Sequence, residues 1–200
     1  MEENDESIKR TGGKETELIS PLSMPMQDGK PYVLPPWRLN EIVMLALETL
    51  ISVDFCREDF NYQKMITDRG IKIKKFSSFS PENLELFTSL SLSQWTEGVC
   101  LVFRDKETGE QKRMIAYNDS RNAAEVMQII LHEFAHIIMR HTQQSVNGEV
   151  EATCFALTMM LFIIIERRFH LGQTIIKTAG KFFLLKEIKK ELFPPAQETA

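Results

Sequence analysis

The chain has 200 residues, of which 43% are hydrophobic and 26% are charged, and its formal net charge is −4. This composition is typical of a globular protein with one sizeable core, and it excludes a wholly disordered chain. The slightly acidic balance disfavours wholesale binding of nucleic acid. Three cysteines, Cys56, Cys100 and Cys154, lack any Cys-x-x-Cys spacing, which indicates reduced thiols and not a disulfide framework.

Two further features bear on where the protein resides. The N-terminus is acidic and polar, unlike a secretory signal peptide. The longest nearly apolar run, Cys154 to Ile165, has twelve residues, fewer than the roughly 20 that span a bilayer. We therefore predict a cytoplasmic protein with no membrane partner.

The chain divides into an arm, one domain and a short tail. Residues 1–36 are polar at first and then rich in proline, which predicts a disordered or extended N-terminal arm. The domain is expected over 37–193. Residues 194–200 begin with two prolines and are predicted to form a C-terminal tail.

Within the domain, hydrophobic periodicity predicts helices at 40–53, 61–69, 81–92, 120–141 and 149–169. Asn40 and Ser80 are the expected caps of the first and third of these helices. Alternating residues predict a strand at 71–76 and a hairpin of strands at 98–104 and 111–117. The expected fold class is α+β, with a small antiparallel sheet of about three strands packed on a helical body.

The helix expected over 120–141 contains the motif His-Glu-x-x-His at 132–136. Side chains four residues apart lie on one face of a helix, so His132 and His136 can bind one metal ion. Glu133 adjoins them and can take a proton from an activated water. This helix is apolar nearly all round, and burying three polar groups without partners is costly, which favours a metal site over two unconnected histidines.

A catalytic zinc needs a third protein ligand and one position open to water. His141 follows His136 by five residues, so on a continuing helix it would point away from the metal. Glu149 and Glu151 begin the next predicted helix, but they face directions about 200° apart and only one can reach the site. Acids are also favoured at a helix N-terminus without any metal, so position alone leaves both open.

The motif at 132–136, followed by Glu-Val-Glu-Ala at 149–152 and Phe-Ala at 155–156, resembles the ImmA/IrrE family of metallopeptidases. Members of that family have a similar order of features: a strand, then His-Glu-Leu-Gly-His, then Glu-x-Glu-Ala-x-x-Phe-Ala. The similarity covers about residues 114–156. Phe134 and Ala135 replace Leu-Gly, and the proline that ends the family's second motif is absent here.

The resemblance implies a zincin-like fold with one zinc ion per chain, held by His132, His136 and Glu151, and Glu133 as the catalytic residue. Glu149 would then cap the helix or support a ligand. Two histidines and a carboxylate also suit Mn²⁺ or Fe²⁺, which we expect less than Zn²⁺. Members of that family cleave helix-turn-helix repressors of mobile elements or stress regulons. The resemblance therefore implies that the substrate of this protein is a repressor of that class.

These observations predict a zinc-dependent metalloendopeptidase, a hydrolase that does not bind nucleic acid directly. The strand at 114–117 is either an edge to which the substrate backbone adds or an ordinary strand, and both alternatives stay open. The rival function is a catalytically silent binding module that sequesters a repressor or a toxin-like partner. The intact His132, Glu133 and His136 argue against that rival, because binding alone does not require them.

Overall fold

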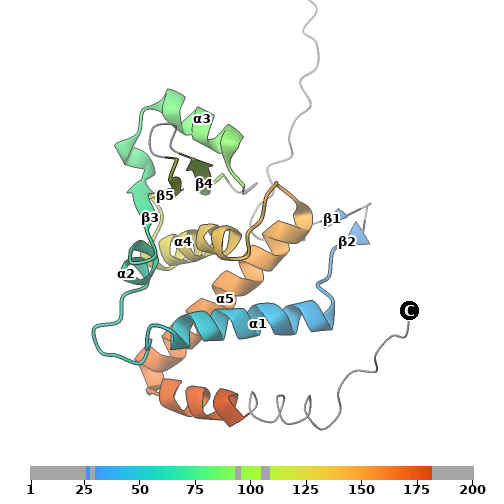
Figure 1. Cartoon of the computed structure of the whole chain (residues 1–200), viewed down its shortest axis with the longest axis vertical. Coiled ribbons are helices and arrows are strands. Elements are labelled where there is room, and N and C mark those ends of the chain that lie inside the picture. Colours follow the sequence, from blue (N-terminus) through green and yellow to red (C-terminus); the bar gives the residue numbers. More distant parts are fainter. Residues whose placement is uncertain (1–25, 28–29, 93–95, 105–108, 182–200) are drawn as a thin grey trace, which may run out of the picture.

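The structure is a computed structural model that describes residues 26–27, 30–92, 96–104 and 109–181 (Figure 1). Its class is α+β, as predicted. The tail at 194–200 and most of the arm lie outside the described residues, so the domain limits stay predictions. Where the arm is described, Met26–Gln27 (β1) and Lys30–Pro31 (β2) pair as short antiparallel strands.

A three-stranded sheet forms one side of the domain, with its strands in the order β3-β5-β4. The strands are β3 (Ile71–Lys75), β4 (Gly98–Arg104) and β5 (Gln111–Tyr117). β4 and β5 form the predicted hairpin, but β3 runs parallel to β5, so the prediction of an antiparallel sheet is wrong. Parallel neighbours need a long connection, and here the chain between them includes α3 (Pro81–Leu90) and β4.

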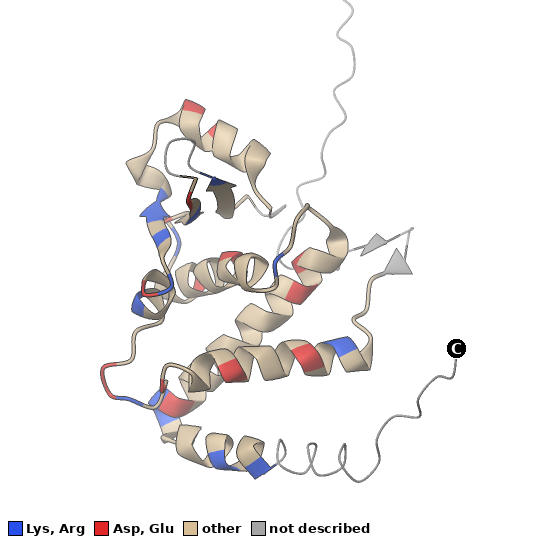
Figure 2. Ribbon diagram, viewed as in Figure 1, with Lys and Arg blue, Asp and Glu red and all other residues tan. Residues whose placement is uncertain are grey.

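β5 is the central strand, hydrogen-bonded on both sides, so the hypothesis that 114–117 offers a free edge is wrong. The edge strand β3 and the neighbouring α2 (Tyr62–Thr67) carry a group of basic residues, coloured blue on the ribbon in Figure 2. The exposed lysines of this group are Lys64, Lys72, Lys74 and Lys75. Lysines on an edge strand discourage the addition of another strand, which leaves β4 as the edge better suited to a partner.

Three long helices form the helical body: α1 (Pro36–Ile51), α4 (Ala123–Ile138) and α5 (Val146–Phe169). α4 contacts β4 and β5 on one side and α5 on the other, and α5 also packs against α1 (Figure 1). α4 therefore lies at the centre of the domain. The largest fully buried side chains come from these layers and include Ile42, Leu50, Ile71, Ile115, Ile130, Leu131, Phe134, Phe155, Met159 and Ile163.

The predicted helices form, but their ends shift. α1 begins at Pro36, since proline suits the first helical position, and the predicted cap Asn40 lies inside the helix. α4 begins after Asn122, whose side chain and that of Glu125 form a capping box. α5 begins at Val146, three residues before the predicted start, because the Ser145 hydroxyl accepts a hydrogen bond from a first-turn amide.

α5 is apolar on most of its surface. By length and composition alone it could cross a membrane. In this fold it contributes a buried stripe against its neighbours, consisting of Gly148, Ala152, Phe155, Ala156, Met159 and Ile163. Leu157, Leu161 and Ile164 lie exposed on another face. Apolar residues on both faces mean that the sequence pattern does not define which side of α5 meets α4.

Candidate metal centre

α4 presents His132 and His136 from consecutive turns into the interior. Their side chains are only 2% and 1% exposed, and their Nε2 atoms lie 3.2 Å apart. A capped helix packed on both sides fixes where the two rings stand. The structure thus brings together the two histidines of the sequence motif.

The carboxylate of Glu149 completes this group from the first turn of α5. Glu149 Oε2 lies 3.1 Å from His132 Nε2, and Glu149 Oε1 lies 3.5 Å from His136 Nε2. Its side chain is 14% exposed. Within the described part of the chain, His132, His136 and Glu149 form a group able to hold a metal ion, with all ligand atoms within 4.8 Å of one another.

Glu151, the predicted third ligand, is not a member of this group, and its role as a ligand stays a prediction. Its carboxylate accepts two hydrogen bonds from Arg38 of α1, at 2.8 and 2.6 Å. The Arg38 guanidinium holds the pKa of Glu151 below its usual range. The two acids do face different directions, as their spacing requires, and α5 presents Glu149 and not Glu151 to His132 and His136.

A threonine that sequence reasoning missed also touches the site. Thr153 Oγ1 lies 3.3 Å from Nδ1 of His132, while Glu149 lies at Nε2 of the same ring. Glu149 and Thr153 are four residues apart on α5 and therefore share a face. If Glu149 is known to face the histidines, the four-residue spacing predicts that Thr153 faces them as well.

His141 returns to the site instead of pointing away from it. α4 ends at Ile138, and Arg140 adopts a left-handed backbone with φ of 57°. The amide of His141 then bonds the carbonyl of His136, and that of Arg140 bonds Ile137, which is a Schellman ending. This reversal places His141 Nδ1 2.9 Å from Nδ1 of His136. The prediction assumed a continuing helix and is wrong for that reason.

The donor atoms suit zinc in kind and in spacing. Three ligands about 2.1 Å from a tetrahedral zinc lie about 3.4 Å from one another. The three separations among His132, His136 and Glu149 are 3.2, 3.1 and 3.5 Å. Burial, reinforced by the neighbouring His132 and His141, lowers the pKa of His136 to about 2. The ring is therefore neutral, which is the form that binds metal.

Glu133 lies next to the group on α4 and is fully buried, at 0% exposure. Strand β4 passes close over it at Gly98, where a Cβ atom would lie 2.6 Å from Glu133 Oε1 and 2.8 Å from Ile129. Burial, and then the nearby Glu133 charge, raises the pKa of the Cys100 thiol well above its usual value. A glycine is thus needed where β4 crosses the carboxylate that the motif assigns to proton transfer.

Substituting Gly98 with alanine is expected to lower the free energy of unfolding by about 1–3 kcal/mol, because the new methyl group forces Glu133 or Ile129 to move. Gly180→Ala is the matched control, since no atom of the described residues lies within 4 Å of its Cβ position. Thermal unfolding of both variants measures the difference. Equal stability of the two variants would contradict the close approach of β4 to α4.

Comparisons of the chain with family models, with curated proteins and with solved structures find no match. The resemblance to ImmA/IrrE metallopeptidases thus rests on the two motifs and remains a prediction.

Proposed function

We propose that this protein is a zinc-dependent metallopeptidase of zincin-like fold, with zinc held by His132, His136 and Glu149. The observation that carries the proposal is the spacing of these three donor groups, which matches zinc ligands although they come from two helices. A buried carboxylate, Glu133, directly follows one of them, as hydrolysis by an activated water requires.

When bound, zinc supplies Lewis-acid chemistry that makes water more acidic and polarises a peptide carbonyl. Glu133 is the general base: its carboxylate accepts a proton from the attacking water and delivers it to the departing amine. Gly98 of β4 lies against this carboxylate, and a Cβ atom there would lie 2.6 Å from Glu133 Oε1. His132, His136 and Glu149 orient the metal and take no proton.

β4 replaces β5 as the strand to which a substrate backbone would add. It is an edge strand, and Gly98 brings it against the catalytic carboxylate. Part of this edge is covered by the chain itself: Cys100 accepts a hydrogen bond from the Leu92 amide at 3.2 Å and donates one to the Ser91 hydroxyl at 3.3 Å. A substrate strand that pairs at Cys100 has to displace this short segment.

The substrate class follows from the resemblance: a helix-turn-helix repressor in the cytoplasm. Zinc-loaded protein is incubated with a repressor of this class from the same genome, and separately with a library of unstructured peptides, and products are identified by mass spectrometry. Cleavage of either substrate by the wild type supports the peptidase. A stable stoichiometric complex with intact repressor, and no cut peptide despite bound zinc, would instead favour the binding module.

Removing the metal is expected to destabilise the fold, because zinc binds the assembled site and not the unfolded chain. At a zinc concentration 100-fold above its Kd the stabilisation is about 2.7 kcal/mol, which raises Tm by roughly 5–11 °C. Calorimetry before and after chelation, with zinc then resupplied, measures this shift. A Tm that zinc leaves unchanged would contradict a metal centre that joins α4 to α5.

A further inference from the structure

A chain of hydrogen bonds connects α1 to His136 through residues that are not among the three proposed ligands. Arg38 donates to Glu151 from Nε and Nη2, at 2.8 and 2.6 Å. Glu151 Oε2 lies 3.3 Å from Nε2 of His141, whose Nδ1 lies 2.9 Å from Nδ1 of His136. Three side chains from α1, α5 and the turn after α4 thus end on one ring of the proposed metal centre.

The outer end of this chain determines which atoms donate. Arg38 stays charged and only donates, and it holds Glu151 as a carboxylate, which only accepts. His141 must therefore donate from Nε2. When its imidazole is neutral, the ring donates from one nitrogen and accepts at the other, so its Nδ1 accepts. His136 then donates from Nδ1. Its lone pair is left on Nε2, the atom that faces His132 and Glu149.

We propose that Arg38, Glu151 and His141 are positioning residues that hold His136 in its metal-binding tautomer. The inference rests on the proposed function and extends it to a second set of residues. Thr153 does not fix the tautomer of His132 in the same way, because its hydroxyl can either donate to the ring or accept from it. Residues that hydrogen-bond to a metal ligand without touching the metal typically contribute about 10–100-fold to metal affinity.

Zinc affinity of the full chain, measured by competition with a chromophoric chelator, tests the proposal. The variants are His141→Ala and Glu151→Gln, the second of which keeps the shape of the side chain. His170→Ala is the control for the histidine, since His170 is 85% exposed and lies at the end of α5. Arg57→Met is the control for the ion pair.

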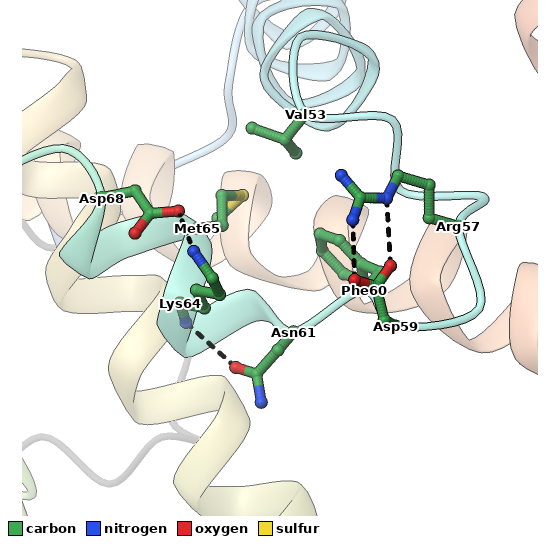
Figure 3. A pocket seen from close by; sticks show the side chains of 8 residues that line it. All are labelled: Val53, Arg57, Asp59, Phe60, Asn61, Lys64, Met65 and Asp68. Carbon is green, nitrogen blue, oxygen red and sulfur yellow. Dashed lines mark hydrogen bonds and ion pairs between the residues drawn. The ribbon is translucent and has the colours of Figure 1, made fainter.

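Arg57 and Asp59 form a two-bond pair at 3.0 and 2.6 Å, much like that of Arg38 and Glu151. Figure 3 shows this pair lining a separate pocket with residues such as Phe60 and Lys64. No histidine lines that pocket among the described residues. Loss of this pair therefore controls for the general effect of removing an arginine–carboxylate interaction.

We expect His141→Ala to raise the zinc Kd by about 10–100-fold, Glu151→Gln to raise it by a smaller factor, and both controls to leave it unchanged. Nitrogen NMR of the zinc-free protein gives a second readout. The wild type should show His136 protonated at Nδ1, and His141→Ala should show a mixture of tautomers.

Wild-type affinity in both His141→Ala and Glu151→Gln would overturn the proposal, as would a wild-type His136 protonated at Nε2. Absence of zinc binding by the wild type would instead contradict the proposed metal centre. The tautomer of His136 is measured without zinc, so the two failures are distinguishable.

Discussion

Glu149→Ala is expected to reduce the zinc content of the purified protein from about one ion per chain to near zero, because a carboxylate ligand is lost. Glu151→Ala should keep about one zinc per chain when zinc is supplied well above its Kd, since Glu151 acts through His141. The two acids are two residues apart in the same helical turn, which makes them a closely matched pair. Elemental analysis after gel filtration measures both.

The opposite pattern would contradict this assignment. Zinc retained by Glu149→Ala and lost by Glu151→Ala would move the ligand to the residue that the family resemblance selects. Circular dichroism of both variants shows whether α5 still forms. His170→Ala, far from the group, sets the baseline for a histidine loss that does not involve the site.

Glu133→Gln is expected to lower the rate of peptide hydrolysis by about 10²–10⁴-fold while zinc content stays at the wild-type level. The amide keeps the size of the side chain beneath Gly98 but does not accept a proton at neutral pH. The measurement is kcat on a peptide cleaved by the wild type, together with elemental analysis. Glu48→Gln, an exposed position on α1, is the control.

Full activity of Glu133→Gln would exclude Glu133 as the general base. An unchanged KM with a reduced kcat would locate the defect in the chemical step. Loss of zinc from the same variant would show instead that Glu133 supports the metal, and the proposed division of roles on α4 would be wrong.

Much of the local structure was predictable because strong signals agree at those places. The β4–β5 hairpin follows from alternating residues around a turn with Gly109, whose φ of 70° suits glycine. Ser80 and Pro81 begin α3 as capping chemistry requires. The spacing of His132 and His136 places them on one face of any helix that contains them.

The third member of the group was not predictable, for two physical reasons. α5 is apolar on both faces, so hydrophobic periodicity does not define which side of the helix, and therefore which acid, faces α4. The family resemblance then selected Glu151, whose carboxylate the structure places with Arg38. Arg38 lies 113 residues away in sequence, and no local pattern indicates that contact.

His141 and β3 illustrate the same difficulty at larger scale. The position of His141 depends on where α4 ends. The left-handed residue that ends it is Arg140 and not glycine, so the sequence does not indicate the turn. The direction of β3 depends on which strand it pairs with, which its own alternating residues do not specify. Both are decided by contacts between elements.

We propose that His132, His136 and Glu149 together hold one zinc ion. Crystals of the zinc-loaded protein, with anomalous diffraction recorded on either side of the zinc absorption edge, test it most directly. We expect a single zinc peak bound by Nε2 of His132, Nε2 of His136 and the Glu149 carboxylate. A peak bound by Glu151 in place of Glu149, or no peak between α4 and α5 in zinc-saturated crystals, would contradict it.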